Sequence, residues 1–186
     1  MSTLRVDNIT NEAGSASPNL PNGLSGDVLT SGTVDTARMP AGSVIQVVQE
    51  IYTTDTEITT TSFSDVGLQA TITPSSVNNK ILCMVSPNSR MKSQHNNFRT
   101  FSLRLTRNGI AITTKRTRDT IAGTGSFGYF VSNGDKQINY LDSPNTTSPV
   151  TYKLQASVSS SADNTGYEFN DGGLGQAEII LMEIVG

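Results

Sequence analysis

The chain has 186 residues, a net charge of −3 and one cysteine. This length fits one core domain with an appendage, and the small negative charge gives no reason to expect nucleic acid or an anionic membrane surface as a partner. A single cysteine excludes a disulfide within the chain, so the fold must be held together by packing.

Hydrophobic residues make up 35% of the chain and aromatic residues 6%, which is lean for a globular monomer. Two interpretations of this thin core stay open. The chain forms a small sandwich with polar outer faces, or it is a subunit that completes its core against copies of itself. We favour the second, because the N-terminal segment also needs partners.

Residues 1–42 predict no independent fold. Leu4, Val6 and Ile9 alternate with polar residues, as in a half-buried strand that is too short to be stable alone. Residues 14–24 are rich in turn formers, and the apolar residues that follow fit no heptad. We expect residues 1–42 to be an extended leader that is held by sister chains, as a homotrimer, or by a docking partner, with Leu4, Val6 and Ile9 as the candidate anchor. A disordered tail is the alternative.

The N-terminus lacks the basic start and the apolar stretch of a secretory signal. No segment approaches the ~20 apolar residues that a membrane-spanning helix needs. We therefore expect synthesis in a cytoplasm without a signal peptide, and no membrane insertion.

From residue 43 onwards the pattern predicts a series of short strands separated by turns. Asn108-Gly109 between two apolar runs indicates a hairpin with a type I′ turn, and no helical period is present. Residues 43–186 are therefore expected to form an all-β head, an antiparallel β-sandwich of jelly-roll type. The expected strands are Val44–Tyr52, Gly67–Thr73, Lys80–Ser86, Phe98–Arg107, Ile110–Lys115, Phe127–Ser132, Gln137–Leu141, Val150–Ser159 and Gln176–Val185, with a short one within Glu57–Phe63.

Two long loops are expected to carry function, residues 87–97 and 160–175. Five predicted strands separate them, so strict up-and-down alternation places them at opposite ends of the sandwich. The second loop offers aromatic rings for a glycan or a protein; alternatively, the rings pin the loop onto the sandwich. Its candidate receptor contacts are Tyr167, Glu168, Phe169, Asn170 and Asp171.

Residues 80–118 contain basic but no acidic side chains, and the segments on either side are mainly acidic. These blocks either neutralise one another across strands or subunits, or the basic block binds an anion such as an acidic glycan. The candidate contacts are Arg90, Lys92, Arg99, Arg104 and Arg107, together with Lys115, Arg116 and Arg118.

The sequence contains little that predicts catalysis. His95 is the single histidine, whereas a metal site or a catalytic triad needs further partners. Carboxylates are present, but no pair can be shown to converge for glycoside cleavage, and Asp163, Glu168 and Asp171 do not have the spacing of a calcium loop. We expect no enzyme activity, no metal and no cofactor.

Three segments carry a resemblance to a known class of proteins. STLRVDNI at 2–9, with PNLPNGL at 18–24, is similar to the N-terminus of many virion structural proteins of marine tailed phages, especially cyanophages. SGTV at 31–34, followed by ARMPAGSVIQVV at 37–48, resembles the joint between shaft and head in short phage fibres, and AEIILMEI at 177–184 resembles the end of their heads.

The resemblance implies a homotrimeric fibre whose N-terminus is attached to the virion and whose head lies outside. Leu4, Val6 and Ile9 are then the candidate anchor to other virion proteins. We expect the head to act by binding rather than turnover, with a host-surface glycan or lipopolysaccharide as the target. The alternative is a capsid decoration protein, or a tail-structural or adaptor subunit, that binds no receptor.

Overall fold

The computed structural model describes five stretches of the chain: residues 38–92, 98–120, 136–162, 165–170 and 175–186. The side chains of residues 92, 98, 99 and 117–120 also lie outside what is described. Of the two units into which the chain divides, the structure describes the second, Met39–Gly186. Leu4, Val6 and Ile9 lie outside the described residues, so their role as a virion anchor stays a prediction.

The second unit is built from antiparallel strands, which confirms the predicted all-β class. The strands are β1 (Val44–Tyr52), β2 (Thr56–Ile58), β3 (Ser64–Ile72), β4 (Lys80–Ser86), β5 (Ser89–Lys92), β6 (Phe98–Arg107), β7 (Ile110–Thr120), β8 (Ile138–Asp142), β9 (Val150–Val158), β10 (Gly166–Phe169) and β11 (Ala177–Ile184). The expected strand Phe127–Ser132 lies outside the described residues.

Eight of these strands pair as one long hairpin that is rolled up on itself. The first of the eight pairs with the last (β1 with β11), and the pairs β3 with β9, β4 with β8 and β6 with β7 follow inwards. Two four-stranded sheets result, in the orders β1-β11-β4-β8 and β3-β9-β6-β7. This winding is the jelly roll, one of the ways in which antiparallel proteins limit their exposed sheet edges.

The core lies between the two sheets and follows from alternation along the strands. In β9, Tyr152, Leu154 and Ala156 are fully buried, whereas Lys153 and Gln155 between them are partly exposed. The period of two turns every second side chain inward. The apolar residues of the strands thus face the space between the two sheets.

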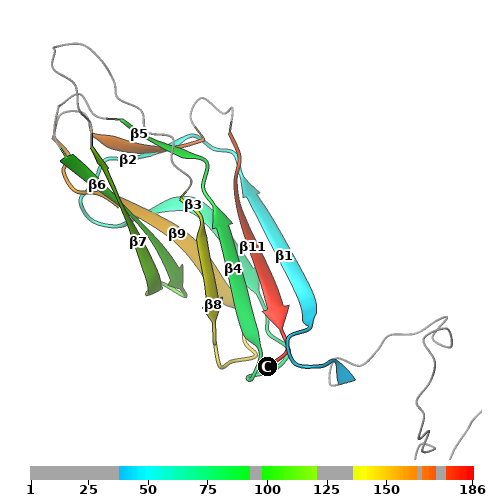
Figure 1. Ribbon diagram of the computed structural model, residues 1–186. Coiled ribbons are helices and arrows are strands. Elements are labelled where there is room, and N and C mark those ends of the chain that lie inside the picture. Colours follow the sequence, from blue (N-terminus) through cyan, green and yellow to red (C-terminus); the bar gives the residue numbers. More distant parts are fainter. Residues whose placement is uncertain (1–37, 93–97, 121–135, 163–164, 171–174) are drawn as a thin grey trace, which may run out of the picture. The chain divides into compact units, whose positions relative to one another are not determined.

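The chain enters and leaves the head at one end. The Gly42 N–H donates to the carbonyl of Val185 at 2.8 Å, and the Val185 N–H donates to the carbonyl of Ser43 at 2.9 Å. We call this the near end. The three-stranded sheet β2-β10-β5 lies at the opposite, distal end, where it closes the sandwich (Figure 1).

The expected placement of the two long loops at opposite ends is wrong. Each loop contains a strand that was not predicted, and these strands, β5 and β10, pair with each other. The described chain between them makes four passages, β6 to β9, rather than the five that were predicted. An even number of passages returns the chain to the end from which it started.

The predicted hairpin is confirmed. Asn108 and Gly109 connect β6 and β7 with φ angles of 48° and 84°. Positive φ at both central residues defines the type I′ turn, and it is an angle that Asn and Gly adopt at lower cost than other residues.

Candidate functional site

The candidate receptor contacts in the second long loop are buried. Tyr167 and Phe169 each have 0% of their surface exposed, because β10 is the middle strand of the distal sheet. Their rings stack in a chain with Phe101, at centroid distances of 5.4 Å between Phe101 and Tyr167 and 4.7 Å between Tyr167 and Phe169. The expectation that these rings face a receptor is therefore wrong, and the alternative, rings that pin the loop onto the sandwich, describes them.

The polar neighbours in the same strand also have structural contacts. Glu168 pairs with Arg90, which lies directly opposite on β5. The Asn170 side-chain amide donates to the carbonyls of Tyr52 and Thr54 at 2.8 and 3.2 Å. Asp171 lies outside the described residues.

Three arginines of the basic block, Arg90, Arg104 and Arg107, each have a separate partner. Arg90 holds the distal sheet through Glu168. Arg104 lies on the outer face of β6, where its Nε donates to Gln155 Oε1 at 2.9 Å and its guanidinium sits 4.1 Å from the centroid of the Phe63 ring. Arg107 pairs with Asp142. Acidic residues from the C-terminal block thus neutralise two of the basic candidates; the side chains of Lys92 and Arg99 lie outside the described part.

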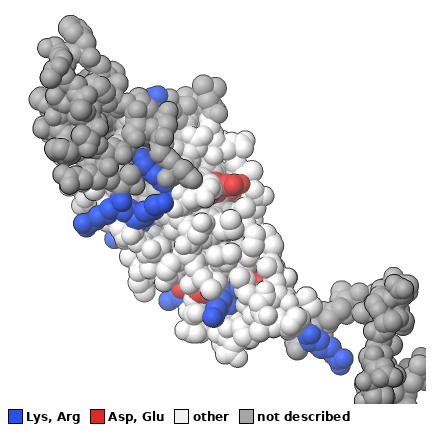
Figure 2. All heavy atoms as spheres, in the orientation of Figure 1, with Lys and Arg blue, Asp and Glu red and all other residues white. Residues whose placement is uncertain are grey.

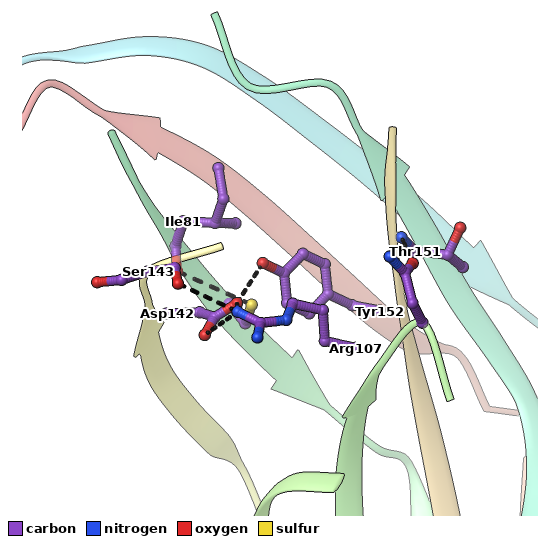
Figure 3. A network of polar contacts seen from close by, with 8 residues as sticks. Ile81, Arg107, Asp142, Ser143, Thr151 and Tyr152 are labelled. Carbon is purple, nitrogen blue, oxygen red and sulfur yellow. Dashed lines mark hydrogen bonds and ion pairs between the residues drawn. The ribbon is translucent and has the colours of Figure 1, made fainter. Parts of the chain in front are cut away.

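A buried polar cluster joins the two sheets (Figure 3). The Asp142 carboxylate on β8 accepts from the Arg107 guanidinium at 2.9 and 3.0 Å and from the Tyr152 hydroxyl at 2.7 Å. Burial, reinforced by the hydrogen bond to Asp142, raises the pKa of Tyr152 well above its ordinary value. Burial likewise raises the pKa of the nearby Cys83 thiol. A tyrosine and a cysteine held in their neutral forms are structural groups rather than nucleophiles.

The outer face of the sheet β3-β9-β6-β7 holds a shallow groove that the sequence interpretation missed. Its volume is about 480 Å³. We call it the polar groove; its lining residues are Asp65, Gln69, Thr71, Thr106, Asn108, Gly109, Thr151, Lys153 and Gln155.

Hydrogen bonds across the strands hold the floor of the polar groove in place. Gln155 Nε2 donates to Asp65 Oδ1 at 2.6 Å, and Lys153 Nζ lies 3.5 Å from Asp65 Oδ2. The hydroxyls of Thr71 and Thr151 are 2.8 Å apart. The groove therefore offers carboxylate and carbonyl acceptors beside ammonium, amide and hydroxyl donors, which suits a ligand whose own hydroxyls both donate and accept.

The sequence held a weak signal for this groove. The outward positions of β9 are Thr151, Lys153 and Gln155, a run of polar side chains with hydrogen-bonding groups. Alternation predicts that such residues face outward, but it does not reveal which strand lies beside β9. The groove needs β3 on one side and the turn after β6 on the other, and these neighbours come from distant parts of the chain.

No known protein family and no curated protein matches the sequence. Among solved structures, the chain superposes on the VP2 subviral particle of infectious bursal disease virus with a TM-score of 0.38 and 12% identity, covering 76% of this chain and 33% of that chain. The Gt strain of the same virus gives a TM-score of 0.32 and 12% identity over 84% of this chain and 42% of that one. The chain thus spans less than half the length of these proteins.

Two further observations bear on the class of site. Among the described residues, no group of three or more His, Cys, Asp or Glu side chains is placed to hold a metal ion. The same part of the chain contains no helix with the length and hydropathy needed to cross a membrane.

Proposed function

We propose that this protein is a virion structural protein of a tailed phage, a fibre or fibre-like appendage whose head binds a glycan on the host surface. The head acts by binding rather than turnover, and the polar groove is its contact surface. The observation that carries the proposal is an outer sheet face that is polar and exposed to solvent, on a head that the chain enters at its near end. The sequence resemblance to phage fibres supports the same function.

The groove fits a glycan better than it fits a nucleic acid or an apolar ligand. Its described lining residues include no aromatic side chain on which a base could stack, and no apolar floor. One groove of this kind makes few contacts and binds weakly. Three heads on one fibre would raise the effective affinity through multivalency.

The virion assignment is tested on particles of the phage that encodes the chain. We expect immunogold against the head to label slender appendages in electron micrographs. Label spread over the capsid would instead identify a decoration protein, and unlabelled particles would contradict a virion role.

The glycan assignment is tested with the full chain and with polysaccharide purified from the host envelope. Gln69→Ala and Lys153→Ala remove a hydrogen-bonding group from the groove, so we expect each to weaken binding by roughly tenfold, the equivalent of about 1.4 kcal/mol. Lys80→Ala removes an exposed charge from the other sheet and should leave binding unchanged. Equal affinity of all four proteins would remove the groove from the contact surface.

A further inference from the structure

The outer face of the other sheet, β1-β11-β4-β8, has a different character from the polar groove. One row of side chains crosses all four strands, and the register places Val47 beside Met182, Met182 beside Leu82 and Leu82 beside Leu141. The next outward row has Ile180 and Met84 at its centre. We call these six residues the apolar face: Val47, Leu82, Met84, Leu141, Ile180 and Met182.

The apolar face is open in the single chain. Val47 and Leu141 at its two edges are 56% and 49% exposed, and the four residues between them are partly exposed. Figure 2 shows a broad area over β4, β8 and β11 without Lys, Arg, Asp or Glu between its two ends. Scattered apolar residues on a surface are ordinary, whereas a contiguous apolar area marks a contact.

The sequence of the two central strands independently indicates that this face becomes covered. Antiparallel strands with one wet face alternate between apolar and polar residues, as β9 does. The segments 81–85 and 179–182 are instead continuous apolar runs, Ile-Leu-Cys-Met-Val and Ile-Ile-Leu-Met. Such runs are typical of strands that are buried on both faces. The core covers one face of β4 and β11, and the other face lacks its cover in the single chain.

We propose that the apolar face is the surface through which three copies of this chain pack their heads together around a common axis. This inference rests on the proposed fibre, because a shared shaft is what holds the three heads side by side. The place where the chain enters the head supports a second copy as the occupant, because Gly42 lies two residues before β1, an edge strand of this sheet. Leaders that join three chains would bring three β1 edges close to one axis.

The charges around the face fit the same occupant. Its charged neighbours, Lys80 and Glu178, lie at opposite ends of the sheet, so parallel heads leave both at the rim, in water. Four strands about 4.8 Å apart and seven residues long cover on the order of 450 Å². This area is smaller than the about 800 Å² that a standard interface takes from each partner, so the shared shaft has to hold the three heads side by side and the apolar face adds to that association.

The test compares the reactivity of single cysteines placed on the two outer faces of the full-length protein. Leu141→Cys lies on the apolar face, and Thr114→Cys is exposed on the opposite sheet. The native Cys83 adds little background because it is buried and its pKa is raised. We expect light scattering to give three copies of the 19.8 kDa chain, and maleimide to label Leu141→Cys at least ~10-fold more slowly than Thr114→Cys, with equal rates in urea.

Equal native labelling rates would overturn the assignment of the face, even if the mass is that of a trimer. A protected Leu141→Cys in a monomer would also overturn it, because a segment of the same chain would then be the cover.

A second experiment places negative charges on the apolar face. Val47→Asp with Leu141→Asp should weaken association by at least ~100-fold, since each interface would bury unpaired carboxylates, and Thr114→Asp should not. The immunogold result does not depend on either experiment, so failure of this inference is distinguishable from failure of the fibre proposal.

Discussion

Replacing Tyr167 by alanine is expected to lower the free energy of unfolding by about 3–5 kcal/mol. The ring is fully buried between Phe101 and Phe169, so truncation removes apolar contacts and leaves a cavity beneath the distal sheet. Urea unfolding of the full-length protein, followed by circular dichroism, measures the change.

Two control variants separate the ring from its hydroxyl and from general surface effects. Tyr167→Phe keeps the ring but removes an acceptor from Ser89, whose hydroxyl lies 3.0 Å away, and should cost about 1 kcal/mol. Ile110→Ala alters a side chain that is 70% exposed and should change stability by less than about 0.5 kcal/mol. If Tyr167→Ala were as mild as Ile110→Ala, the ring would belong to the surface and a receptor role would return.

Tyr167 also illustrates where the sequence misleads. The segment 163–173 is rich in Asp, Asn and Gly, a composition typical of loops. Within it, the four residues of β10 are all buried, so they show no alternation that would reveal a strand. The lack of alternation follows from the position of β10 as a short central strand that lies across the end of the core. That position depends on β2 and β5, which come from distant parts of the chain.

Features that depend on residues close together in the sequence could be predicted. The Asn108-Gly109 hairpin is fixed by the backbone angles of two adjacent residues. The strands β1, β4 and β6 have the predicted bounds because the apolar pattern that predicts each strand lies within that strand's own sequence. The jelly-roll order could not be read in this way, because β1 pairs with β11 from the other end of the head. The polar groove and the apolar face depend on that order, and so does the pairing of charges between the basic and acidic blocks.

The pairing of Arg107 with Asp142 gives the second large expected effect. We expect Asp142→Ala to lower the free energy of unfolding by about 3 kcal/mol, since loss of the carboxylate leaves the Arg107 guanidinium without its counter-charge. The Asp142 side chain is 7% exposed and that of Arg107 is 31% exposed. Water can therefore hydrate the Arg107 guanidinium in the variant, which offsets part of the cost of losing the ion pair. The Tyr152 hydroxyl, fully buried, loses its acceptor as well. Urea unfolding again provides the measurement.

The matched control is the ion pair on the outer face. Asp65 and Lys153 are 3.5 Å apart and their side chains are 49% and 38% exposed, so Asp65→Ala should cost less than about 1 kcal/mol. A double-mutant cycle then isolates the pair: in an Arg107→Met background, Asp142→Ala should cost at least about 1 kcal/mol less than it does alone. Equal costs in both backgrounds would mean that Asp142 stabilises the head through Tyr152 and not through Arg107. The contact that joins β8 to the opposite sheet would then be the hydrogen bond from the Tyr152 hydroxyl on β9 to the Asp142 carboxylate, rather than the ion pair between β8 and β6.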